Sequence, residues 1–210
     1  MIITEPMTMA TDYVMGVLAL VLAVRLIRAG AVTGRTPVWV WGLAFMATAS
    51  ASFFGGTYHG FIQMLPVGTA GVLWKMTLMS TGIGSACLLA AVALAGTTGW
   101  IRRVWFVLVA VKLAVYVLWM STHDDFIFVI ADYGSALLVM LVLVWMSSPA
   151  GLRVAARWIT AGVAVSVVAA LIQALKLAPH PQFNHNDLFH VVQMVALYLL
   201  YRGGLLLHRS

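Results

Sequence analysis

The chain has 210 residues, of which 63% are hydrophobic and only 9% are charged. A soluble domain carries about a quarter of charged residues, so this composition excludes a water-soluble globule and predicts a protein surrounded by lipid. The net charge of +6 does not indicate nucleic-acid binding, because the basic residues are scattered over short loops instead of forming one face. The lone Cys87 excludes an internal disulfide and a four-cysteine metal site.

The N-terminal segment does not have the pattern of a signal peptide. Glu5 and Asp12 stand where a signal peptide carries basic residues, and Arg25 and Arg28 come at the end of the first apolar run. The first helix is therefore predicted to stay in the membrane.

Apolar segments long enough to cross a bilayer follow one another along the whole chain. A spanning helix needs about 20 apolar residues. The predicted spans are Thr11–Ile27, Val38–Tyr58, Thr69–Ala95, Val104–Met120, Phe126–Met146, Val154–Leu175 and Leu188–Leu207. The connections between them, among them Ser147–Gly151, are short, and no internal repeat is present. We expect an all-α fold in which residues 1–210 form a single seven-helix transmembrane domain.

The arginines predict the orientation of these spans. They lie in or beside the first, third and fifth loops and at the C-terminus: Arg25, Arg28, Arg35, Arg102, Arg103, Arg153, Arg157, Arg202 and Arg209. The second and fourth loops contain neither arginine nor lysine. Because basic loops stay in the cytoplasm, the N-terminus is predicted outside and the C-terminus inside, in the plasma (bacterial inner) membrane.

Polar residues of six predicted helices gather at the outer end. They are His59, Lys75, His123, Asp124, Asp125, Asp132, Tyr133, Gln173, Lys176, His185, Asn186, Asp187 and His190. Charged groups at membrane depth are costly unless they face a cavity or one another. The pattern therefore predicts an outward-facing polar cavity, which Trp74 is placed to line.

The densest polar segment, Asn184–His190, opens the seventh span. If the helix begins near Asn186, then Asn186, Asp187 and His190 share one face, and His185 lies just before it. With His59 across the bundle, His190 and either His185 or Asp187 would form a catalytic zinc site in which the metal activates water. The alternative is that Asn184, Asn186 and Asp187 cap the helix.

Lys112 lies midway along the fourth span, at the depth of Asp132 on the fifth. A buried lysine must pair or lose its charge, so we predict a Lys112–Asp132 pair, with Lys75 as a competing partner for Asp132. The pair is interpreted as a structural tie between helices. The alternative is that it positions Asp132 beside the metal or substrate. Asp132 would then be a second candidate catalytic carboxylate, in addition to Asp187.

Two short strings resemble the CREST superfamily of seven-span membrane proteins, which includes the alkaline ceramidases and the adiponectin-receptor (PAQR) proteins. Gly55–His59 looks like its second-span pattern, and Leu188–Val192 looks like the pattern around its second seventh-span histidine. The resemblance implies that His59 and His190 bind zinc, whose bound water hydrolyses a lipid amide. The family has histidine where Asn186 stands here, and an aspartate in the neighbourhood of Lys75.

These observations lead to three functional hypotheses. The first is a zinc-dependent hydrolase acting on a lipid amide or ester at the outer face. The second is a non-enzymatic, receptor-like or lipid-binding protein that keeps the fold without the metal. A transporter ranks last, because no proline interrupts any predicted span.

Overall fold

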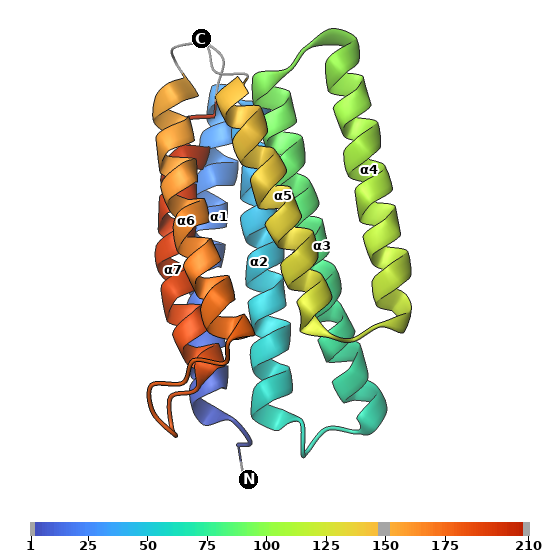
Figure 1. Ribbon diagram of the computed structural model, residues 1–210, viewed down its shortest axis with the longest axis vertical. Helices are drawn as coiled ribbons and strands as arrows, with labels where there is room; N and C mark the ends of the chain where they lie inside the picture. Colours follow the sequence, from blue (N-terminus) through green and yellow to red (C-terminus); the bar gives the residue numbers. More distant parts are fainter. Residues whose placement is uncertain (1–2, 147–151, 208–210) are drawn as a thin grey trace.

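The computed structural model describes residues 3–146 and 152–207, which form seven α-helices. These are α1 (Pro6–Thr33), α2 (Thr36–Phe61), α3 (Val67–Gly96), α4 (Gly99–Thr122), α5 (Phe126–Met146), α6 (Arg153–Ala174) and α7 (His185–Gly204). Consecutive helices run in opposite directions, so α1, α3, α5 and α7 begin at the same end of the bundle (Figure 1). We name this end, with Glu5, His59 and His185, the polar end, and the opposite one, with Arg35 and Arg102, the arginine end.

Six of these described helices, α1 to α6, are long and apolar enough to cross a membrane. Their number and composition make the chain an integral membrane protein. The remaining helix, α7, has 20 residues, but its first turn contains His185, Asn186 and Asp187. The first turn of α7 is therefore strongly polar, and Arg202 lies in its last turn.

Short-range signals set the helix ends at the arginine end. Gly34 follows α1 with φ of 65°, and the N–H of Arg35 donates to the carbonyl of Gly30 at 2.9 Å. Glycine suits this left-handed position because it has no Cβ. Pro37 lies in the first turn of α2. A Cβ on Gly30 would lie 2.5 Å from the Trp39 backbone nitrogen, so glycine here lets α1 and α2 approach closely.

Each predicted span overlaps one observed helix, but helix ends differ at both ends of the bundle. At the arginine end, α1 ends at Thr33 instead of Ile27 and α4 begins at Gly99 instead of Val104. Helix α1 begins at Pro6 instead of Thr11, and α7 begins at His185 instead of Leu188. His185 is thus the first residue of the helix, although it was predicted to precede it. The first turns of α1 and α7 could not be recognised from apolar periodicity, because they carry polar side chains whose partners lie inside the bundle. The predicted loop Ser147–Gly151 and Arg209 lie outside the described residues.

The helices are packed unevenly. Helices α1, α2, α3 and α7 form the closely packed part, with α6 against α7 and α5 against α3 and α6. Helix α4 stands at the edge of the bundle and packs on α3 (Figure 1). Its outward side chains, among them Val107, Val111 and Leu118, are exposed and apolar, as lipid-facing residues are. The space enclosed by the other helices holds the candidate site.

Candidate functional site

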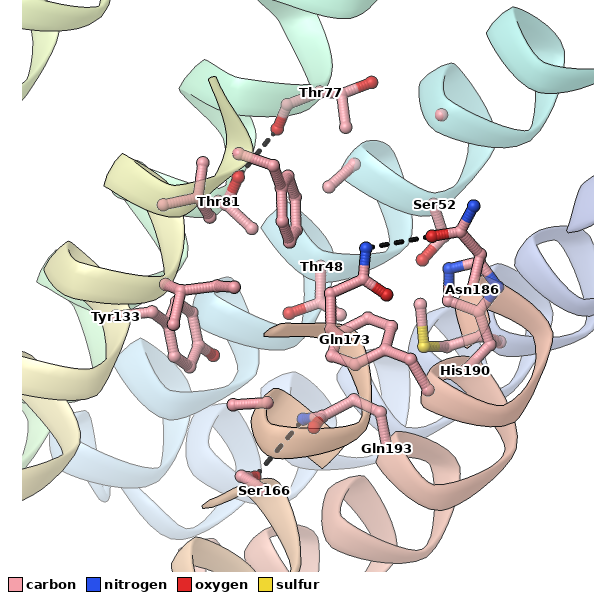
Figure 2. A pocket seen from close by; sticks show the side chains of 18 of the residues that line it. Thr48, Ser52, Thr77, Thr81, Tyr133, Ser166, Gln173, Asn186, His190 and Gln193 are labelled. Atoms are coloured by element: carbon pink, nitrogen blue, oxygen red, sulfur yellow. Dashed lines mark hydrogen bonds between the residues drawn. The ribbon is translucent and has the colours of Figure 1, made fainter. Parts of the chain in front are cut away.

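A cavity of about 240 Å³ lies inside the bundle, lined by every helix except α4. Its polar lining consists of Asp12, Thr48, Ser52, His59, Thr77, Thr81, Tyr133, Ser166, Gln173, Asn186, His190 and Gln193. Figure 2 shows how side chains from separate helices, such as Tyr133, Gln173 and His190, converge on this space. The prediction of a cavity among these polar groups is confirmed for His59, Tyr133, Gln173, Asn186 and His190.

The remaining lining is apolar. Aliphatic side chains of α5 and α6 contribute Val129, Ile130, Leu137, Val167 and Ala170. Three aromatic side chains, Trp74, Phe126 and Phe189, line the cavity from α3, α5 and α7, and the Trp74 and Phe126 rings lie 6.2 Å apart. The expected position of Trp74 in the lining is confirmed. The cavity is therefore amphipathic.

His190 of α7 is held against α1. Its Nε2 lies 3.2 Å from Oδ1 of Asp12, and its Nδ1 lies 2.9 Å from Oγ1 of Thr11. Asp12 and His190 are only 4% and 7% exposed. Both ring nitrogens of His190 thus have partners on a helix that is distant in sequence. Such a carboxylate–imidazole pair fixes the ring orientation and shares a proton.

His59 at the end of α2 forms a similar pair. Its Nδ1 lies 3.2 Å from Oε2 of Glu5, which precedes α1. The His59 ring contacts Trp74 edge-on, with ring centres 6.3 Å apart. Sequence reasoning used Glu5 and Asp12 only to exclude a signal peptide and did not place them in the site. The available signal was Asp12, a carboxylate next to an apolar run, which is a functional indication inside a membrane helix.

The start of α7 is stabilised by a capping box. The Asn184 side chain accepts from the N–H groups of Asn186 and Asp187, and Asp187 Oδ2 accepts from the Asn184 N–H at 2.7 Å. The cap interpretation is therefore confirmed for Asn184 and Asp187. Asp187 is fully buried, and its charge lies close enough to Asp12 and His59 to interact with theirs. Asn186 turns to the cavity instead, where its Oδ1 accepts from Gln173 Nε2 at 2.9 Å.

Three buried oxygen atoms at this site have no hydrogen-bond partner among the described residues. They are Ser52 Oγ, Gln173 Oε1 and Asp187 Oδ1. Ser52 is 2% exposed and, like Gln173, lines the cavity. A buried polar atom without a partner costs about 1–3 kcal/mol, so such atoms mark places where a bound molecule or water supplies the partner.

The predicted metal ligands are only partly brought together. His59 and His190 line the same cavity, whereas His185 does not line it. Within residues 3–146 and 152–207, no three histidine, cysteine, aspartate or glutamate side chains come close enough to hold one metal ion. The donors as arranged do not supply the three protein ligands of a catalytic zinc site. Zinc therefore stays a prediction from the sequence.

Asp132, the other predicted catalytic carboxylate, lies outside this lining. Its Oδ2 accepts from Lys112 Nζ at 2.7 Å and from Ser85 Oγ at 2.8 Å. The predicted Lys112–Asp132 pair is confirmed, and Lys112 also contacts Ser85 Oγ. This cluster joins α4, α3 and α5.

Lys75 does not compete for Asp132. Its Nζ donates to the carbonyls of Met120 and His123 at 2.6 and 2.9 Å and pairs with Asp124 at 2.7 Å. A cation suits this position because the last carbonyls of α4 lack partners within the helix and carry partial negative charge. Lys75 therefore fixes the end of α4 to α3.

No curated protein and no solved structure matches this chain. Residues 7–209 match the model of a protein family that is described as a family of unknown function, DUF6962. Since the match covers nearly the whole sequence, the chain belongs to the DUF6962 family.

Proposed function

We propose that this protein binds a small amphipathic molecule in the cavity lined by α1, α2, α3, α5, α6 and α7. The observation that carries the proposal is the pairing of apolar walls with buried polar atoms that have no partner among the described residues, Ser52 Oγ and Gln173 Oε1. Ligand sites commonly combine a largely apolar lining with a few convergent polar groups. This favours the receptor-like or lipid-binding alternative over hydrolysis.

In the proposed arrangement all seven helices span the membrane, with the polar end outside and the arginine end in the cytoplasm of the plasma (bacterial inner) membrane. The polar first turn of α7 is compatible with a spanning helix, because Asn186 and His190 face the cavity and Asp187 is fully buried. None of these groups has to meet lipid. The arginines at the other end support the orientation.

Cysteine labelling tests this topology. In a Cys87→Ala background, a cysteine introduced by His180→Cys, before α7, should react with a membrane-impermeant maleimide on intact cells. A cysteine introduced by Arg202→Cys, near the end of α7, should react only after permeabilisation. Both positions are exposed, so equal reactivity on intact cells would contradict the proposed crossing of α7.

Ligand binding is tested by filling the cavity. Gly134 lines the cavity, and a Cβ on it would meet no heavy atom within 4 Å, so Gly134→Leu has room for its side chain. Gly71 in α3 also has open space around it but does not line the cavity, so Gly71→Leu is the matched control. Both changes replace glycine by leucine within a helix.

The measurement is native mass spectrometry of protein extracted gently from the membrane, with the bound molecules then released and identified. A bound amphiphile is expected on the wild type and on Gly71→Leu, and at least tenfold lower occupancy on Gly134→Leu. Equal occupancy of the two leucine variants would place any bound amphiphile on the outer surface and sink the proposal.

The second candidate is the zinc-dependent hydrolase, with divergent membership of the CREST superfamily. It is favoured by one observation, that His59 and His190 line one cavity, each beside a carboxylate. The test is zinc content by elemental analysis in wild type and His190→Ala. Near-stoichiometric zinc that is lost in the variant supports this candidate, and metal-free wild-type protein purified without chelator excludes it.

A further inference from the structure

The polar end of the cavity is short of positive charge. Three carboxylates, Glu5, Asp12 and Asp187, lie at this end with only two imidazoles, His59 and His190. If all three carboxylates are to carry their charge, even two protonated imidazoles leave one negative charge without a counter-charge. No lysine or arginine of the described residues lines the cavity. The lysines of α3 and α4 are paired elsewhere, Lys75 with Asp124 and Lys112 with Asp132.

Uncompensated charge is costly at membrane depth, so a cation is the chemical complement of this end. The buried cavity atoms that have no partner among the described residues can accept hydrogen bonds, and an ammonium group donates them. Ser52 Oγ and Gln173 Oε1 accept hydrogen bonds, and His190 contacts only one oxygen of Asp12. A primary ammonium carries three N–H donors and accepts none.

Aromatic rings surround the same end. Ring contacts run from Tyr58 to Trp74 (5.0 Å between centres), from Trp74 to Phe126 (6.2 Å) and from Phe126 to Phe189 (6.4 Å). The last three of these side chains line the cavity. Ring faces attract organic cations, most strongly where water is excluded. Beyond the rings, the aliphatic side chains of α5 and α6 provide an apolar wall.

We propose that the ligand of this cavity is an amphipathic amine, whose ammonium group binds Asp12 and Ser52 below the aromatic rings and whose hydrocarbon part lies against Ile130 and Val167. This assignment rests on the proposed ligand-binding function and names its chemical class. An ammonium needs only one carboxylate and scattered acceptors. It therefore fits a site in which no three metal-ligand side chains of the described residues converge.

The test compares three probes that share one tail and differ in the head: octylamine, octan-1-ol and octanoate. Each is titrated into the protein in phosphatidylcholine nanodiscs, and the apparent affinity is taken from the rise of the melting temperature with probe concentration. Octylamine is expected to bind wild type at least tenfold more tightly than octan-1-ol, and octanoate is expected not to bind.

Asp12→Asn should abolish the preference for the amine. Asp125→Asn is the matched control, because Asp125 is an exposed aspartate at the same end of the bundle that does not line the cavity. If Asp12→Asn does not fold, Ser52→Ala serves in its place. It should weaken octylamine binding about tenfold, the usual effect of losing one hydrogen bond to a charged group.

The outcomes separate this assignment from the proposed function. Equal binding of octylamine and octan-1-ol, lost for both in Gly134→Leu, would overturn the amine assignment and leave cavity binding intact. Preference for octanoate would overturn it too. If none of the three probes gives a shift that Gly134→Leu removes, both the assignment and ligand binding in this cavity fail.

Discussion

Two clusters of charged groups lie within this bundle, one partly buried and one fully buried, and they differ in whether each polar atom has a partner. In the Lys112–Asp132–Ser85 cluster, one cation meets one carboxylate, and the serine hydroxyl contacts both. In the Asp12–His190–Asp187 cluster, carboxylates outnumber the imidazole, and Asp187 Oδ1 and the nearby Ser52 Oγ have no partner among the described residues.

The two clusters show how structural charge can be distinguished from functional charge in a membrane protein. A self-contained cluster links helices and has no need of a further molecule, and this one fastens the edge helix α4 to α3 and α5. A cluster with spare acceptors beside a cavity is complete only with a partner from outside the chain. Substitutions in each cluster test whether one is structural and the other binds a ligand.

The largest expected effect is on the self-contained cluster. Lys112→Met leaves the partly buried Asp132 without its cation and should lower the free energy of unfolding by about 3 kcal/mol, the low end of the range for a buried ion pair. The measurement is reversible unfolding by SDS in mixed micelles. The double variant Lys112→Met with Asp132→Leu should recover most of the loss, because an apolar pair replaces the ion pair. Unchanged stability of the single variant would show that the pair does not hold α4.

Two serines give a smaller, matched contrast. Ser85→Ala removes a hydroxyl that donates to Asp132 and should cost about 1–3 kcal/mol. Ser52→Ala removes a hydroxyl without a partner among the described residues, so ligand-free protein should be equally stable or slightly more stable. The free energies of unfolding of the two variants are measured by the same reversible unfolding in SDS. A larger loss for Ser52→Ala than for Ser85→Ala would reverse the distinction between the clusters.

The smallest expected loss of stability is at Asp187. Asp187→Asn keeps an oxygen that can accept from the Asn184 N–H, so the cost should stay below about 1 kcal/mol. It removes one of the three carboxylates at the polar end of the cavity, so octylamine should bind several-fold more weakly while octan-1-ol binding is unchanged. Asn184→Ala, which breaks the cap, is the control for a purely structural effect. If both variants change stability and amine binding alike, Asp187 acts only through the cap.

Much of the fold could be predicted, because each apolar run is long enough to become a helix and breaker residues such as Pro66 separate the runs. The Lys112–Asp132 pair was predictable too, since both residues sit at one depth on consecutive helices. The position of α4 at the edge was not, because lipid and protein interior are both apolar and the sequence of a lipid-facing helix resembles that of a buried one.

The candidate site was predictable only in part. His59 and His190 stand out as polar residues near the ends of apolar runs, and both line the cavity. Asp12 was missed, because the first span was expected to begin at Thr11, which made Asp12 a boundary residue. Whether Ser52 has a hydrogen-bond partner depends on its neighbours in three dimensions, and no sequence pattern carries that information.

Mapping where a photoreactive ligand attaches shows whether an amphiphile sits inside the bundle. An octylamine with a diazirine in its chain is crosslinked to the protein in nanodiscs, and the labelled residues are identified by mass spectrometry. Labels are expected on Ile130, Leu137 and Ala170, which line the cavity, and excess octylamine should remove them. Labels spread over exposed lipid-facing residues such as Val111 and Leu118, unchanged by excess octylamine, would contradict it.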